Sequence, residues 1–151
     1  MTSMTVTRTV DAPRKVVWDV ITDLDHAPQV MEAISRVERV RGDGFDVGTR
    51  WRETRTMFGR EATEEMEVTA IDPPRGYVVE ADGQGAHYRT EFTLDDEGDG
   101  TRVTMTFGAD PKGVTGRLMA ATVGRLFAGA TRKAVAADLA DVARASEARA
   151  R

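Results

Sequence analysis

The sequence predicts an α+β fold with a seven-stranded antiparallel sheet, two short helices after the first strand and one long C-terminal helix. Three observations predict it. Strand-like segments rich in β-branched and aromatic residues alternate with short connections that contain Gly, Pro and Asp. Apolar residues recur at helical spacing after the first of these segments, and again from residue 113 almost to the end. Because strands joined by short connections pair antiparallel, the sheet is expected to be a meander.

The chain begins with a strand and two short helices. Thr and Val dominate Met4–Val10, as is typical of a strand. Asp11 is expected to cap a helix whose first turn contains Pro13. Its apolar positions at helical spacing are Val16, Val17, Val20, Ile21 and Leu24. A second short helix is expected within Asp23–Met31, with Pro28 near its start.

Six more strands and one helix are expected to follow. The strands are Ile34–Arg41, Thr49–Phe58, Glu61–Ile71, Tyr77–Ala81, His87–Leu94 and Arg102–Gly108. A helix that runs from Gly113 almost to the end would be roughly 45 Å long and would cross the whole sheet. Gly124 and Gly129 interrupt it, which suggests close approach of another element or a local bend. The tail is expected to fray after Ser146.

Composition favours one domain, residues 1–151, and excludes several functions. Hydrophobic residues make up 40%, and a formal net charge of -4 gives no basic surface for a nucleic acid. The chain has no cysteine, and two isolated histidines, His26 and His87, do not predict a metal site. No signal core or run of roughly 20 apolar residues occurs, so we expect a cytoplasmic protein without stable membrane insertion. No cofactor is expected.

The segment Gly48–Val68, GTRWRETRTMFGREATEEMEV, predicts a hairpin with polar groups on its inner face. Side chains alternate between the faces of a strand, and a turn centred on Gly59 and Arg60 would set Arg55 opposite Glu64. The expected inner residues are Trp51, Glu53, Arg55, Met57, Ala62, Glu64, Met66 and Val68; the expected outer residues are Arg50, Arg52, Thr54, Thr56, Thr63, Glu65 and Glu67. A slip of one residue would bury Glu65 and Glu67, so we reject it.

The following strands extend the inner face by the same alternation. Their expected inner residues are Tyr88, Thr90, Phe92, Leu94, Val103, Met105 and Phe107, joined by Tyr77 and Val79. His87 is out of phase with Tyr88 and is expected to face solvent. An apolar and aromatic wall with a few polar groups is typical of a small-molecule pocket. The candidate ligand-binding residues are Trp51, Glu53, Arg55, Met57, Glu64, Met66, Tyr88, Phe92, Met105 and Phe107.

The element order, with TVDAPRKVVWDVITDLDHAP at the start, DPPRGYVV in the middle and GDGTRVTMTF before the last helix, resembles the polyketide cyclase/dehydrase and lipid-transport family. This family is part of the START-like, Bet v 1-like superfamily (SRPBCC). The resemblance covers roughly Met4 to Ala145. It implies a helix-grip fold, in which a curved sheet wraps the long helix around a deep cavity. It does not imply one reaction, because family members include cyclases, lipid and quinone carriers, hormone-binding proteins and chaperone cofactors.

The residues leave three functions open. The first is binding of a hydrophobic or amphipathic small molecule, with Arg55 anchoring an anionic or carbonyl group and Glu53 and Glu64 holding its guanidinium. The second is a cyclase or dehydratase in which Arg55 or Tyr88 polarises a carbonyl oxygen and Glu53 or Glu64 moves a proton, although no catalytic constellation is matched. The third is a partner-binding module that uses the outer sheet face, in a monomer or a homodimer. Alternatively, Arg55 and Glu64 form only a half-solvated salt bridge. Ala27 and Val30 lie where quinone-binding members carry bulk, a departure that disfavours a quinone carrier.

Overall fold

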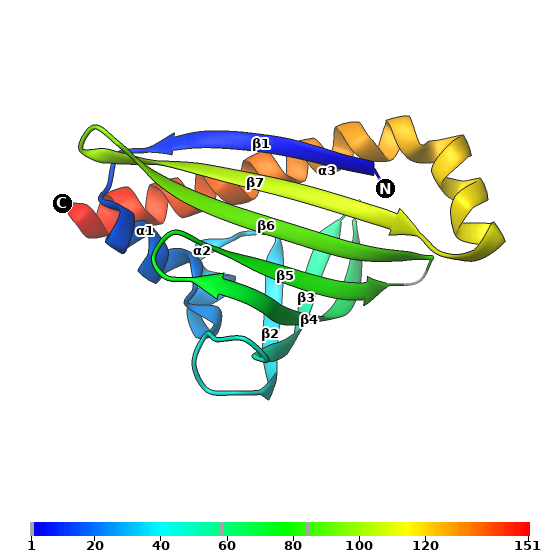
Figure 1. The fold of residues 1–151 in the computed structure, drawn as a ribbon, viewed down its shortest axis with the longest axis horizontal. Helices are drawn as coiled ribbons and strands as arrows, with labels where there is room; N and C mark the ends of the chain where they lie inside the picture. Colours follow the sequence, from blue (N-terminus) through cyan, green and yellow to red (C-terminus); the bar gives the residue numbers. More distant parts are fainter. Residues whose placement is uncertain (1, 58, 84) are drawn as a thin grey trace.

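The computed structural model describes residues 2–57, 59–83 and 85–151, without the side chains of residues 2, 57, 115 and 119–128. In this part of the chain the sheet has seven strands in the order β1-β7-β6-β5-β4-β3-β2. All neighbouring strands are antiparallel, so the α+β meander expected from the sequence is confirmed. Figure 1 shows α3 running behind the long strands, with α1 near its C-terminal end.

The observed elements lie close to the expected ranges. The strands are β1 (Thr2–Val10), β2 (Ile34–Arg41), β3 (Arg50–Met57), β4 (Arg60–Asp72), β5 (Gly76–Gly83), β6 (Ala86–Glu97) and β7 (Gly100–Pro111). The helices are α1 (Arg14–Ile21), α2 (Ala27–Val30) and α3 (Gly113–Ala150), and a short 3-10 turn, η1 (Leu24–His26), precedes α2. The expected second helix is therefore divided between η1 and α2.

The core lies between α1, the inner face of the sheet and the C-terminal half of α3. Its most deeply buried members include Val10, Val17, Val68, Leu94, Val103, Leu139 and Val142. On α3, the buried residues Val135, Leu139 and Val142 follow one another at intervals of four and three, as an amphipathic helix requires. Apolar burial of this kind is the main driving force for holding α3 against the sheet.

Two local expectations at the ends of the helices are wrong. Asp11 does not cap α1; the N-cap residue is Pro13, which makes no side-chain cap bond. The Asp11 backbone N–H donates instead to Glu147 Oε2 of α3, at 2.9 Å. The tail does not fray after Ser146, since α3 continues to Ala150 and Ser146 is fully buried.

Gly124 and Gly129 are the two glycines that were expected to interrupt α3. A Cβ added at Gly129 would meet no atom within 4 Å, so close approach of another element does not explain this glycine. The interpretation of Gly124 lies outside the described side chains. The sequence did not indicate a role for Gly116. A Cβ added at Gly116 would lie 2.3 Å from the Gly85 carbonyl oxygen. The first turns of α3 therefore rest directly on the backbone of the β5–β6 connection.

The β3–β4 hairpin has the expected faces but a different register. Met57 pairs with Arg60, so Glu53 lies opposite Glu64 and Arg55 lies opposite Ala62. The expected pairing of Arg55 with Glu64 is thus wrong by two residues, and Gly59 has a positive φ of 72° in the short connection. Because side chains alternate with a period of two, an offset of two leaves every residue on its expected face.

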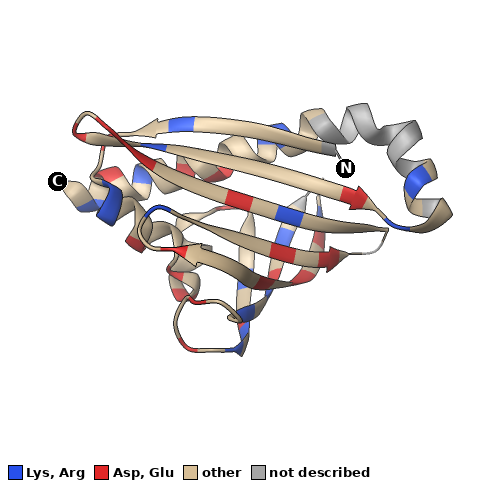
Figure 2. Ribbon diagram, viewed as in Figure 1, with Lys and Arg blue, Asp and Glu red and all other residues tan. Residues whose placement is uncertain are grey.

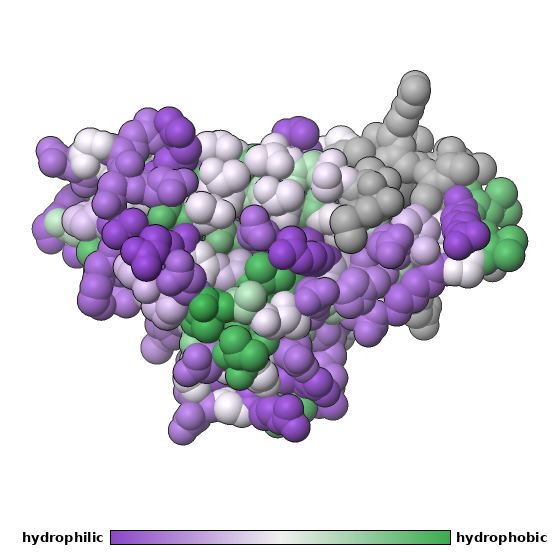
Figure 3. Space-filling view, viewed as in Figure 1, coloured by the Kyte–Doolittle hydropathy of each residue, from purple (hydrophilic) through white to green (hydrophobic). Residues whose placement is uncertain are grey.

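The outer face of the sheet carries paired charges, visible as red and blue bands in Figure 2. Arg50 contacts Glu67, and His87 contacts Glu80 and Asp82 at 2.9 and 2.7 Å. His87 thus lies on the outer face, as expected. The face seen in Figure 3 is mainly hydrophilic, with small hydrophobic areas.

One outer residue differs from expectation. Thr54 is only 7% exposed, and its hydroxyl lies 2.8 Å from that of Thr63 on the neighbouring strand.

Candidate functional site

A cluster of charged side chains joins β3 to α3 inside the fold. Arg55 Nε donates to Glu53 Oε2 at 2.7 Å, and Arg55 Nη2 lies 2.8 Å from Asp138 Oδ2 on α3. Trp51 Nε1 donates to the other Glu53 oxygen at 3.3 Å. Glu53 and Asp138 are each 7% exposed and Trp51 is 3% exposed. Buried charges require such pairing, and here one guanidinium serves two carboxylates.

Alternation along β3 places Trp51, Glu53 and Arg55 on one face, and the sequence predicted this part of the cluster. The sequence reasoning missed Asp138. A signal was present, because Asp138 lies three residues after Val135 and four before Val142, within the apolar stripe of the helix. An acidic residue in such a stripe indicates a buried partner on the facing element.

Burial and neighbouring charges shift the pKa values of Arg55 and Asp138. Burial opposes the charge on Arg55, yet Asp138 and Glu53 together hold the Arg55 pKa above its ordinary value. Burial raises the pKa of Asp138, and the attraction of Arg55 offsets this only in part because the negative charges of Glu53 and Asp141 raise it further. Asp138 Oδ1 is buried and has no hydrogen-bond partner among the described residues.

Glu64 and Tyr88 meet beside this cluster. A Cβ added at Gly83 would lie 2.6 Å from the Tyr88 ring and 3.1 Å from Glu64 Oε1, so both side chains occupy the space that the glycine leaves. Burial raises the pKa of Glu64, the charge of Glu53 raises it further, and Arg55 lowers it. Burial and then Glu64 raise the pKa of Tyr88. Glu64 is therefore a carboxyl group that holds its proton more firmly than an exposed one.

The other candidate residues line the same face. Phe92 stacks on Tyr77 with ring centroids 4.7 Å apart, and Tyr88 stacks on Phe107 at 5.7 Å. Met105 is buried, and Met66 is partly buried against the core. The orientation expected for Met57 concerns a side chain outside the described part. No role was expected for Phe45, whose ring lies 4.8 Å from that of Tyr77.

Exposure rises along the inner face from the core toward the β3–β4 hairpin. On β4, Val68 is fully buried, Met66 and Glu64 are partly buried, and Ala62 is exposed. On β7 the same change occurs between Met105, which is buried, and Phe107, which is partly exposed. The inner face is therefore tightly packed beside α1 and less tightly packed beyond the charged cluster.

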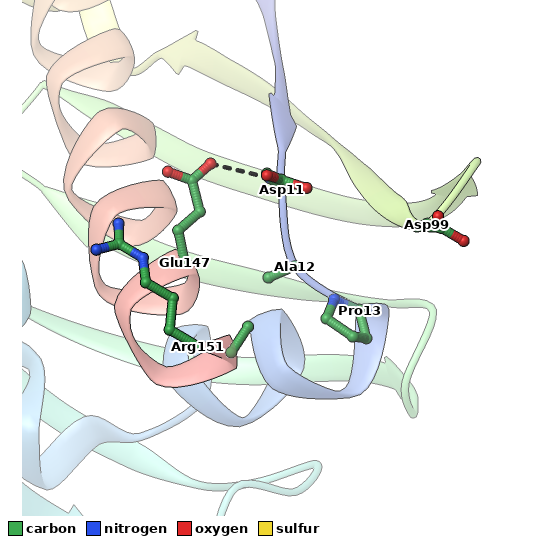
Figure 4. A pocket seen from close by; sticks show the side chains of 7 residues that line it. Asp11, Ala12, Pro13, Asp99, Glu147 and Arg151 are labelled. Atoms are coloured by element: carbon green, nitrogen blue, oxygen red, sulfur yellow. Dashed lines mark hydrogen bonds between the residues drawn. The ribbon is translucent and has the colours of Figure 1, made fainter.

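Two hollows that are lined wholly by described residues lie elsewhere. One of about 340 Å³ is bounded by Asp11–Pro13, the β6–β7 turn at Asp99 and the C-terminal end of α3 (Figure 4). Another, of about 400 Å³, lies along the β2–β3 connection, residues 41–49. The acidic side chains around the first do not by themselves make a site. Neither hollow contains a residue of the charged cluster.

Neither a membrane span nor a metal cluster occurs in the described part of the chain. No described helix combines the length and the apolar character needed to cross a bilayer. No group of three or more His, Asp and Glu side chains among the described residues is arranged to hold a metal ion.

Solved structures of the same fold are similar over nearly the whole chain. The crystal structure of TTHA0849 from Thermus thermophilus has a TM-score of 0.83 and 18% identity, covering 99% of this chain and 100% of that one. That of the Zhui aromatase/cyclase from Streptomyces sp. R1128 has a TM-score of 0.82 and 18% identity, covering 99% and 96%. That of Ara h 8.0201 has a TM-score of 0.73 and 16% identity, covering 95% and 97%. At these identities the likeness establishes the fold alone. We found no significant match among curated protein sequences.

Membership of a family rests on the sequence match. The family model described as polyketide cyclase/dehydrase and lipid transport matches residues 1–147. The observed sheet, the long helix and the neighbouring structures are those of a Bet v 1-like fold. This family and fold fit the binding of a hydrophobic ligand or polyketide cyclase activity. The chain therefore belongs to the polyketide cyclase/dehydrase and lipid-transport family.

Proposed function

We propose that this protein binds a hydrophobic small molecule between the sheet and α3, with the polar end of the molecule at the cluster of Glu53, Arg55 and Asp138. The observation that carries the proposal is the change in exposure beside this cluster. The apolar side chains Met66, Phe92 and Phe107 remain partly exposed on the inner face, although complete packing would bury them. An apolar wall beside a few fixed polar groups is the usual composition of a ligand site.

The buried ion pairs support binding more than they support stability. Replacing a buried ion pair with packed apolar residues is often neutral or stabilising, so such a cluster is weak evidence of a structural role. The cluster lies next to the partly exposed apolar side chains, where it would orient a ligand. An apolar body binds in many orientations, and a directional hydrogen bond selects one of them. The polar group of the ligand would thus be held close to Arg55 and Asp138.

A block of the site tests the proposal. Thr90 is an inner-face residue of β6 between Val79 and Phe107, and Thr93 on the same strand faces outward. We expect Thr90→Phe to fill the site and to weaken binding of a neutral naphthalene probe at least about tenfold, while Thr93→Phe leaves it unchanged. Calorimetric titration of the purified variants measures this. Equal affinities in both variants would place binding elsewhere and refute the proposal.

A catalytic use of the same site is the second candidate, and Glu64 favours it. Burial and the charge of Glu53 raise its pKa, so Glu64 keeps a proton to higher pH than an exposed carboxyl group does, and Tyr88 beside it carries a hydroxyl. In a cyclase or dehydratase, Glu64 would move a proton while Arg55 or Tyr88 polarises a carbonyl oxygen. Exchange of the acidic C–H protons of an aryl diketone for deuterium, followed by NMR, tests this. Catalysed exchange that Glu64→Gln abolishes would support it.

The outer face gives less support to the partner-binding alternative. Its charges are paired with one another, as in Arg52 with Glu38 and Arg89 with Glu91. The centre of a typical protein interface is instead depleted in charge and enriched in aromatic residues.

A further inference from the structure

The charged cluster contains a buried acceptor that no donor reaches. Two of the three guanidinium nitrogens of Arg55 are engaged, Nε by Glu53 and Nη2 by Asp138, and the indole N–H of Trp51 is also engaged by Glu53. By contrast, Asp138 Oδ1 is buried without a partner among the described residues. The carboxyl group of Glu64 is influenced by burial and by the charges of Glu53 and Arg55, with no hydrogen bond among these influences.

The charges of the cluster, like its unpartnered acceptor, favour a ligand that donates a hydrogen bond over one that carries a negative charge. Three carboxyl groups, Glu53, Glu64 and Asp138, lie around one guanidinium, and two of them already contact it. Glu53 and Glu64 are direct cross-strand partners, an arrangement in which like charges destabilise one another. A carboxylate ligand would add a further negative charge where the single cation is already neutralised. A ligand that donates a hydrogen bond would instead satisfy a buried acceptor that lost its water when the protein folded.

We propose that the polar group recognised here is a hydrogen-bond donor, a hydroxyl on an apolar or aromatic body, and that carboxylates are disfavoured. This inference rests on the proposed function and specifies its ligand class. It reverses the expectation from the sequence that Arg55 anchors an anion, because that expectation did not include Asp138. Asp138 and Glu64 are the residues that would favour a hydroxyl group over a carboxylate as the polar group of the ligand.

Three probes with the same aromatic body separate the possibilities: β-naphthol, its methyl ether and β-naphthoate. Titration calorimetry at about pH 8 keeps the naphthol neutral and favours the ionised form of Glu64. We expect β-naphthol to bind about tenfold or more tightly than the ether, as a hydrogen bond to a charged acceptor provides, and β-naphthoate to bind most weakly. The ether measures the apolar contribution alone.

Variants identify the acceptors. Asp138→Asn and Glu64→Gln each keep the shape of the side chain and remove its charge. We expect at least one of them to reduce the preference for β-naphthol over the ether severalfold and to improve the binding of β-naphthoate. Glu65→Gln is the matched control, because Glu65 is adjacent to Glu64 on β4 but lies on the outer face. It should change none of the three affinities. If Asp138→Asn does not fold, Glu64→Gln still provides the test.

The outcomes are distinguishable. Equal binding of all three probes, tightest binding of β-naphthoate, or a preference that survives both variants would overturn the inference and leave the proposed function standing. Failure of all three probes to bind would overturn the proposed function and the inference with it.

Discussion

Removing the guanidinium of Arg55 should destabilise the protein strongly. Arg55→Met keeps much of the apolar stem and leaves Glu53 and Asp138 buried without a cation. Breaking a buried pair by removing one partner costs about 3 to 5 kcal/mol. The carboxylate side chains are 8% and 10% exposed, but Arg55 is 23% exposed, so solvent partly compensates. We expect a loss of about 2 to 4 kcal/mol in the free energy of unfolding at neutral pH.

The pH dependence of this loss identifies its cause. Without Arg55, Asp138 loses the attraction that lowers its pKa, so its pKa in the folded variant should lie further above that in the unfolded chain. A carboxyl group with a raised folded pKa penalises folding only when it must ionise, so the penalty is absent below the unfolded pKa and grows as pH rises through the folded one. The difference between variant and wild type should therefore be largest at neutral pH and should shrink as pH falls toward about 4.

Urea unfolding of both proteins across this pH range, followed by far-ultraviolet circular dichroism, measures the effect. With a slope of about 2 kcal/mol/M, the midpoint at neutral pH should fall by about 1 to 2 M. The control is Arg52→Met on the outer face, whose half-exposed guanidinium lies 3.2 Å from Glu38. It should cost less than about 1 kcal/mol. Equal losses for the two variants, or a loss at Arg55 that does not change with pH, would refute the reasoning.

Two further predictions concern glycines and acid titration. Gly116→Ala should destabilise the protein because its Cβ would lie 2.3 Å from the Gly85 carbonyl oxygen, whereas Gly129→Ala, with no atom within 4 Å, should stabilise it by about 0.5 to 1 kcal/mol. Thermal unfolding tests the pair, and a stabilising Gly116→Ala would show that the contact yields. Because the folded pKa of Glu64 is raised, the wild type should lose stability relative to Glu64→Gln as pH rises above the ordinary value of 4.5. Urea unfolding against pH measures this, and parallel stability curves for the two proteins would contradict it.

The order and type of the elements follow from the sequence because they depend on local physical chemistry. Turn residues punctuate the strands, and helical spacing marks α1 and α3. Alternation identified the inner face of the β3–β4 hairpin, which includes Trp51, Glu53 and Arg55. This assignment survived an error of two residues in the register, because only an odd offset exchanges the two faces.

The contacts of the site depend on the tertiary structure. The register of the β3–β4 connection placed Glu53 opposite Glu64, and alternation along one strand does not determine which residue lies opposite. The pairing of Arg55 with Asp138 joins positions 83 residues apart, and the packing of α3 against the sheet decides it. The donor and acceptor balance of the site follows from that one contact. The sequence therefore determined which residues face inward, and the docking of α3 decided which of their charges are satisfied, because pairing depends on distances between elements that no local pattern encodes.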